Sequence, residues 1–185
     1  MHSRFLFEPQ HYPGSTFTHI FDAHFGAAER SSVCSIEFEP NPDLSARHHE
    51  LQQAYAAQGW RVIYAPYAVG AARAQLTFYR NDDLSRVPKH TGISFGMVDR
   101  SHATTTGATV NVTTIDFPRL VRLLEARRRR SPLSAAPSGR VVVKMDIEGA
   151  EYAVIDSMIS QVRQASTRAF PAVPPTDPCI VCIFI

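Results

Sequence analysis

A run of three valines that leads into an acidic turn constrains the fold of this chain more than any other feature. Valines at positions 141–143 indicate a strand that is buried on both faces, as strands are in a parallel sheet. Asp146 and Glu148 follow at once, and apolar residues then recur at helical spacing from about residue 149 to residue 164. A buried strand that runs directly into a helix predicts a βαβ unit, and hence an α/β protein.

The same alternation of strand and helix patterns extends along the rest of the chain. Its 185 residues suit one domain, which we expect to span residues 1–185. A segment rich in proline, serine and alanine at 131–139 predicts a linker, and the proline-rich segment 165–178 predicts a loop. Strands that alternate with helices in this way predict a mainly parallel sheet with flanking helices. The predicted strands cover residues 4–7, 33–38, 61–69, 75–79, 110–115, 140–147 and 179–185. The predicted helices cover residues 15–26, 41–59, 117–127 and 149–164.

Local signals mark the ends of two of these helices. Ser15 or Thr16 can cap the first helix, and Gly26 can close it. The segment Asn41-Pro42-Asp43 combines a capping side chain, a first-turn proline and an acid that complements the helix dipole. Gly59 then ends the second helix.

Composition argues against several classes of protein. A formal net charge of +2 is not the strong basic excess of a nucleic-acid binder, and Arg127 to Arg130 is interpreted as a solvated helix end. The sequence contains no apolar run near the ~20 residues that cross a bilayer, which predicts a cytoplasmic protein without a membrane partner. Three cysteines predict packed thiols rather than a disulfide scaffold or a metal site, and Cys179 and Cys182 lack a matching second pair.

Two acidic residues stand at the end of the strand predicted for 33–38. Glu39 occupies the place from which a carboxylate can accept hydrogen bonds from two ribose hydroxyls. Glu37 lies two residues earlier, on the same face of the strand. The alternative is that Glu39 only caps the helix that follows, and the local sequence leaves both interpretations open.

A second group of carboxylates follows the valine strand, and it has three alternative interpretations. Asp146, Glu148 and Glu151 crowd one corner at the carboxyl end of the strand. Such crowding can raise a carboxyl pKa and create a general base. It can also bind a hard cation such as Mg²⁺, although the lack of nearby histidines disfavours a transition metal. Compensation of the helix dipole is the third interpretation.

These two segments carry a resemblance to a known family. EFEPNP at 37–42 and KMDIEGAEYAVI at 144–155 are similar to the paired signatures of FkbM-type methyltransferases. VTTID at 112–116 also resembles the "TLD" segment of that family. The resemblance covers roughly residues 33–160, and KMDIEGAE is its more specific part.

The resemblance implies a Rossmann-like class I methyltransferase fold that uses S-adenosyl-L-methionine (SAM). It also implies methylation of a hydroxyl on a small molecule or sugar, so the expected partner is a small-molecule acceptor. By position in the motifs, Glu39 would bind the SAM ribose and Asp146 would lie between methyl donor and acceptor. Asp146 and Glu148 are the candidate catalytic residues, with Asp146 as the base or the group that orients the acceptor. No metal ligand is expected.

The chain departs from the family pattern in two places. The family has a glycine-rich turn after its first strand, and by spacing the segment from Glu8 to Ser15 takes that place here. Glu8, Gly14 and Ser15 are therefore the candidate residues for the methionine end of SAM, where helix amides would face its carboxylate. The sequence also ends near strand five of seven, so we expect the C-terminal strands to be incomplete. These departures keep a second hypothesis open, a catalytically inactive Rossmann-like binding domain derived from a methyltransferase.

Overall fold

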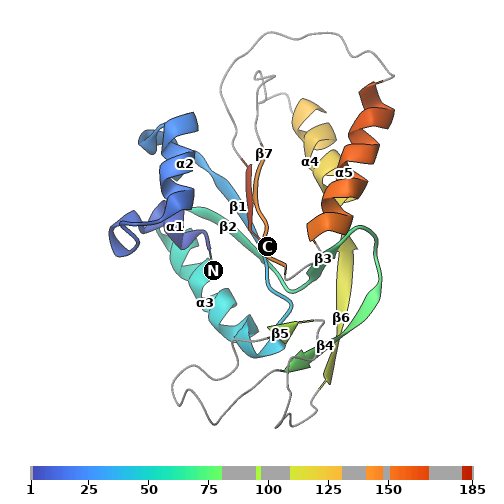
Figure 1. Ribbon diagram of the computed structural model, residues 1–185. Helices are drawn as coiled ribbons and strands as arrows, with labels where there is room; N and C mark the ends of the chain where they lie inside the picture. The colour runs from blue at the N-terminus through green and yellow to red at the C-terminus, as the bar shows by residue number, and fades with distance from the viewer. Residues whose placement is uncertain are drawn as a thin grey trace.

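A four-stranded parallel sheet forms the centre of the protein in its computed structural model (Figure 1). The structure describes residues 2–80, 95–96, 109–130, 141–147, 151–166 and 181–184. The strand order is β2-β1-β8-β7, and each neighbouring pair is parallel. This arrangement confirms the predicted α/β class. The strands of this sheet are β1 (Cys34–Phe38), β2 (Arg61–Ala65), β7 (Val141–Lys144) and β8 (Val181–Phe184).

Helices cover both faces of this sheet (Figure 1). On one face lie α1 (Arg4–Phe7), α2 (Thr16–Phe25) and α3 (Ser45–Ala57). On the other lie α4 (Phe117–Arg130) and α5 (Glu151–Ser166). Short 3₁₀ turns η1 (Pro9–His11), η2 (Ala27–Ser32) and η3 (Pro42–Leu44) connect elements of the first face.

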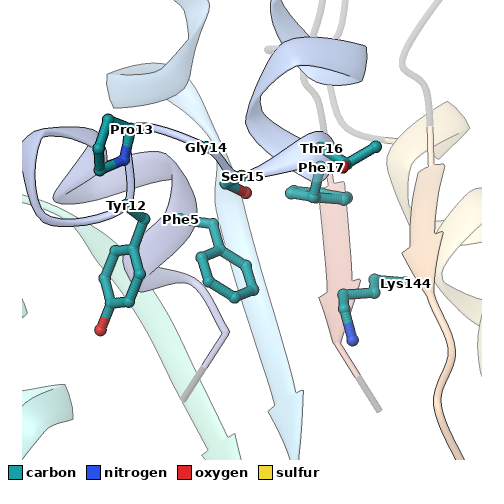
Figure 2. A pocket seen from close by; sticks show the side chains of 8 residues that line it. All are labelled: Phe5, Tyr12, Pro13, Gly14, Ser15, Thr16, Phe17 and Lys144. Atoms are coloured by element: carbon teal, nitrogen blue, oxygen red, sulfur yellow. The ribbon is translucent and has the colours of Figure 1, made fainter.

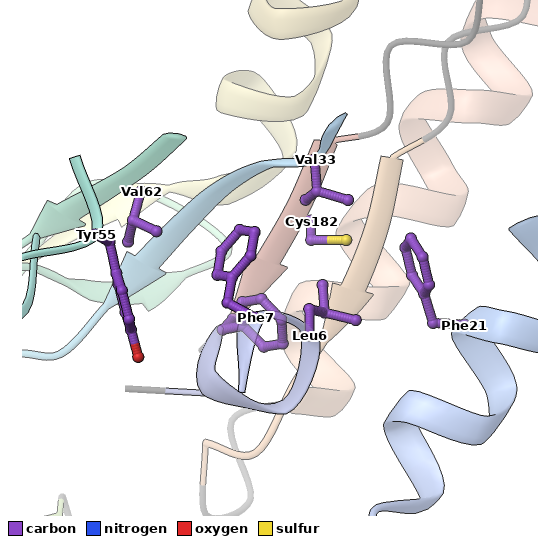
Figure 3. Close-up of a cluster of buried hydrophobic side chains, with 8 residues drawn as sticks. Leu6, Phe7, Phe21, Val33, Tyr55, Val62 and Cys182 are labelled. Carbon is purple, nitrogen blue, oxygen red and sulfur yellow. The ribbon is translucent and has the colours of Figure 1, made fainter. Parts of the chain in front are cut away.

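Each helical layer has its own hydrophobic core against the sheet. The core beneath α1–α3 is drawn in Figure 3 and contains Leu6, Phe7, Phe21, Val33, Tyr55, Val62, Cys182 and Phe184. The core beneath α4 and α5 contains Phe38, Val69, Phe117, Val154 and Ile183. The successive residues Cys182 and Ile183 enter opposite cores because side chains alternate along a strand. Burial raises the pKa of the Cys182 thiol to about 12, which fits the packed thiol that was predicted; Cys179 lies outside the described residues.

A second four-stranded sheet has the order β3-β6-β4-β5. The prediction of one strand over residues 61–69 was wrong, because the segment divides into β2 in the first sheet and β3 in the second. Pro66 stands between them and has no N–H to donate to a ladder, so the strand breaks there. The strands predicted over residues 75–79 and 110–115 agree broadly with β4 and β6. The strands of this sheet are β3 (Ala68–Gly70), β4 (Gln75–Arg80), β5 (Phe95–Gly96) and β6 (Thr109–Asp116).

Residues 4–7 form the short helix α1, so the prediction of a first strand there was wrong. A run of four mainly apolar residues cannot be assigned to strand or helix by periodicity alone. Leu6 and Phe7 bury their side chains in the core beneath α1–α3. Thr18 donates its hydroxyl to the Phe5 carbonyl oxygen at 2.7 Å, which ties α1 to α2.

The last strand of the chain lies in the interior of the sheet. β8 is inserted between β1 and β7 and is parallel to both. Phe184 and Ile183 are almost fully buried, one on each face of the sheet. In this interior position both apolar side chains are covered, and the backbone of β8 pairs with a strand on each side.

The predicted helix ends are confirmed. The Ser15 hydroxyl accepts from the Thr18 amide at 3.2 Å at the start of α2, and Gly26 closes that helix with φ of 89°. Asn41 accepts from the Asp43 amide at 3.0 Å at the start of η3, which leads into α3. Gly59 follows α3 with φ of 80°, a conformation that glycine adopts without strain. Within the described part of the chain, no helix is long and apolar enough to cross a bilayer.

Candidate active site

The carboxyl ends of β1, β8 and β7 carry a row of side chains that face α1–α3. Glu37 on β1 is in register with Tyr64 on one side and with Phe184 on the other. Phe184 is in turn in register with Lys144 on β7. Because the strands are parallel, residues that follow these positions emerge at one edge of the sheet, where α/β proteins bind ligands.

A cavity of about 450 Å³ lies at the β7 end of this row (Figure 2). The loop before α2 and the first turn of that helix form one wall, and Lys144 enters from β7. The described lining is mainly apolar, with Lys144 as its cation. The residues that line the cavity are Phe5, Tyr12, Pro13, Gly14, Ser15, Thr16, Phe17 and Lys144.

Two of the three residues predicted for the first loop line this cavity. Gly14 and Ser15 both border it, and Ser15 also caps α2. A Cβ atom added to Gly14 would meet no protein atom within 4 Å, so the backbone there faces open space. Glu8 lies elsewhere. Its carboxylate accepts from the Tyr55 hydroxyl at 2.7 Å and from Arg4 at 2.8 Å, which makes it a structural clamp between α1 and α3.

Glu39 lies beyond the end of β1, two residues after Glu37. Its Oε1 accepts from the Asn41 amide at 2.8 Å, so the helix-capping interpretation holds for one oxygen. Its carbonyl oxygen accepts from the Tyr64 hydroxyl at 3.3 Å. Burial raises the pKa of the half-buried Glu39 carboxyl. The capping contact uses Oε1, and within the described part of the chain Oε2 accepts no hydrogen bond.

Glu37 plays a part that the sequence did not reveal. The side chain is 3% exposed, and its carboxylate accepts from the backbone amide of His2 at 3.1 Å and from that of Ser3. Burial raises the pKa of this carboxyl. The Glu37 carboxylate therefore fixes residues 2 and 3 above the middle of the sheet, and no local sequence signal indicates a contact across 34 residues.

His2 lies over β8, the strand between β1 and β7. Its ring stacks on Phe184 with centroids 6.2 Å apart. Burial and, to a smaller extent, the charge of Lys144 lower the pKa of His2 to about 4. His2 is therefore held over β8 by its ring contact with Phe184 and by the bond from its backbone amide to Glu37 on β1.

Asp146 lies on the β7 side, two residues beyond Lys144. Its side chain is 69% exposed, and its Oδ2 is 3.5 Å from the Lys144 Nζ. Glu151 turns back, and its Oε1 accepts from the Ile147 amide at 2.8 Å. Glu148 lies outside the described residues, so the predicted group of three carboxylates stays a prediction. Among the residues that are described, no three acidic, histidine or cysteine side chains come close enough to hold a metal ion.

Glu39 and Asp146 emerge at the same edge of the sheet, on strands that flank β8. Strands are spaced about 4.8 Å apart, so these two strands run about 10 Å from each other. Neither carboxylate is among the described residues that line the cavity, although Lys144 joins the cavity to Asp146. The carboxyl ends of these strands thus carry two carboxylates, Glu39 and Asp146, and the cavity lies on the Asp146 side.

Comparison with known proteins identifies the family. Residues 11–169 match the methyltransferase FkbM domain, which agrees with the resemblance drawn from EFEPNP and KMDIEGAE. Neither a curated protein nor a solved structure matches the chain. The match spans most of the chain and both signature segments, and the parallel sheet with helices on both faces is consistent with a Rossmann-like methyltransferase fold. The chain therefore belongs to the FkbM methyltransferase family.

Proposed function

We propose that this protein is a SAM-dependent O-methyltransferase that acts on a hydroxyl of a small molecule or sugar. Membership of the FkbM family makes it a methyltransferase domain, and methyltransferases of this kind typically use SAM. The observation that carries the proposal is the cavity at the carboxyl edge of the sheet. Gly14, Ser15 and Lys144 border that cavity together, although they lie far apart in sequence.

The cavity fits the methionine end of SAM by the chemistry of its lining. The first amides of an α-helix have no acceptor within the helix, so those of Thr16 and Phe17 can bind an anionic group. The rings of Phe5 and Phe17 offer an apolar wall to the methylene chain. Open space at Gly14 lets a ligand approach the backbone closely.

Glu39 fits the ribose end. A carboxylate at the end of the strand next to the central one can accept hydrogen bonds from two ribose hydroxyls. One oxygen of Glu39 already caps the following turn, and this contact holds the carboxylate in place. A ligand that reaches from the cavity beside β7 to Glu39 beyond β1 crosses β8, where His2 stacks on Phe184.

Bound in this way, SAM would supply the methyl group for the acceptor oxygen, with the bonding electron pair retained on sulfur in S-adenosylhomocysteine. Asp146 takes the proton that the acceptor hydroxyl loses. Its exposed position at the end of β7 lets an acceptor reach it from solvent. Lys144, which lines the cavity, lies 3.5 Å from the Asp146 carboxylate, so a bound methyl donor and the base would be close together, and such proximity is the main contribution of the protein.

The test of this proposal measures S-adenosylhomocysteine formation with a panel of sugars and small hydroxyl compounds. Asp146→Asn keeps the shape of the side chain and removes the base. We expect the rate to fall about 10²-fold or more while SAM binding is retained. Asp156→Asn, an exposed acid on α5, changes the net charge equally and should leave the rate unchanged.

The second candidate function is a Rossmann-like binding domain without catalysis. It is favoured by the first loop, where Gly14 is the single glycine between residues 8 and 15. Saturable SAM binding without turnover on any acceptor would support this candidate. Full turnover by the Asp146→Asn variant would instead refute the role of Asp146 while leaving the enzyme intact.

A further inference from the structure

We propose that Lys144 binds the carboxylate of the SAM methionine group and makes the cavity selective for a cofactor that carries that carboxylate. The inference rests on the proposed function and assigns a binding residue within the same site. The observation behind it is the presence of a lysine in the cavity, which has no part in capping a helix and is not one of the acidic residues of the motif. Lys144 is the cationic side chain among the described residues of a mainly apolar cavity.

Lys144 has hydrogen-bonding capacity to spare. Its Nζ is 3.5 Å from the Asp146 Oδ2, which is longer than the roughly 2.7–2.9 Å of a charge-assisted hydrogen bond. An ammonium group carries three donors, so one loose contact does not saturate it. The side chain is 25% exposed, which leaves the ammonium group accessible from the cavity.

Apolar side chains flank this ammonium group. Phe5, Tyr12 and Phe17 line the cavity beside it and would contact the uncharged part of a ligand. The described lining contains no carboxylate, and the acid near the ammonium group is Asp146, which lies outside the lining at 3.5 Å. The nearby Arg4 guanidinium lies over the Tyr12 ring at 5.3 Å, but it is already paired with Glu8 at 2.8 Å.

The position of Lys144 favours the cofactor's own carboxylate over an anionic group of the acceptor. The Lys144 side chain faces the loop before α2, the loop that takes the place of the family's cofactor turn. Glu39, the proposed ribose ligand, lies two strands away across β8. A ligand whose carboxylate meets Lys144 and whose ribose meets Glu39 therefore spans the central strand, as a methionine joined to a nucleoside does.

Equilibrium dialysis with SAM and with decarboxylated SAM tests this assignment. Decarboxylated SAM keeps the sulfonium, the amine and the nucleoside and lacks only the carboxylate. We expect Lys144→Gln to weaken SAM binding about tenfold or more and to leave decarboxylated SAM unaffected. Lys144→Arg should keep most of the preference for SAM. Arg119→Gln, an exposed cation on α4, removes the same charge from the other face and should bind both ligands like the wild type.

Two outcomes would overturn the assignment. Lys144→Gln that binds SAM as the wild type does would show that the carboxylate lies elsewhere, and the proposed function would stand. Equal losses for SAM and decarboxylated SAM would show that Lys144 supports the site without touching the carboxylate. A wild-type protein that binds neither ligand would refute the proposed function itself, and this inference would fall with it.

Discussion

Two glutamates at the end of β1 differ in task because they differ in what already binds them. Glu37 is almost fully buried and accepts the backbone amides of His2 and Ser3. Glu39 is half-buried and accepts the Asn41 amide at one oxygen. Replacing Glu37 would therefore disturb the fold, whereas replacing Glu39 tests the ligand site.

We expect Glu39→Ala to weaken SAM binding about tenfold or more, because hydrogen bonds to a charged group contribute about 1.5–3 kcal/mol each. The turnover rate at saturating SAM should change less than the affinity does. Glu50→Ala, an exposed acid on α3, is the control. Titration calorimetry measures the affinities, and unchanged SAM affinity in Glu39→Ala would remove Glu39 from the site.

His48 makes the stability of the protein depend on pH. Burial lowers its pKa from 6.5 to about 4, and its buried Nδ1 has no hydrogen-bond partner in the described part of the chain. As pH falls, His48 takes up its proton in the unfolded chain before it does so in the folded protein. The contribution of neutral His48 to the free energy of unfolding is therefore complete above pH 6.5 and is lost as pH falls towards 4. The loss is about 1.4 kcal/mol per pH unit.

The variant His48→Phe isolates this contribution, because a phenyl ring can keep the edge-on packing against Tyr64 at 4.9 Å. Denaturant unfolding across this pH range should give a flatter profile for His48→Phe than for the wild type. His49→Phe, at the exposed neighbouring position, should keep the wild-type slope. Parallel profiles for wild type and His48→Phe would contradict the assignment.

At the scale of single elements, α2 joins stability to the site, because its capping residue also lines the cavity. The Ser15 hydroxyl satisfies the Thr18 amide. We expect Ser15→Ala to lower the free energy of unfolding by about 1 kcal/mol, and Ser15→Asn to restore most of it. Urea denaturation measures both, with the exposed Ser31→Ala as the control. A Ser15→Ala variant as stable as the wild type would show that the cap contributes nothing.

The sequence predicted elements well where local chemistry decides them. The ends of α2 and α3 follow from Ser15, Gly26, Asn41 and Gly59, each of which acts on its own neighbours. The segment 4–7 was assigned wrongly because its helix depends on Leu6 and Phe7 finding a core built from distant residues. Short apolar segments carry too little periodicity to decide between strand and helix.

At the scale of the whole molecule, the last strand holds the sheet together from the inside. Ile183 on β8 is 0% exposed, whereas Ile63 on β2 is 50% exposed. We expect Ile183→Ala to lower the free energy of unfolding by about 2–5 kcal/mol and Ile63→Ala to have a much smaller effect. Guanidinium unfolding of this matched pair is the measurement. Similar losses for both variants would contradict an interior position for β8.

The shared edge of Glu39 and Asp146 could be predicted because parallel strands end together. The contact of Lys144 with the first loop could not, although Lys144 lies within the family motif. It depends on β8 separating β1 from β7 and on where α2 is held above them. The hydrogen bonds from the backbone amides of residues 2 and 3 to the Glu37 carboxylate likewise could not be predicted from any spacing in the sequence.

The central claim is that the carboxyl edge of this sheet holds SAM. Isothermal titration of the purified wild-type chain with SAM tests it most directly, with circular dichroism to verify that the protein is folded. The account predicts saturable one-to-one binding that S-adenosylhomocysteine displaces by competition. A folded protein that gives no saturable heat with either compound would contradict it.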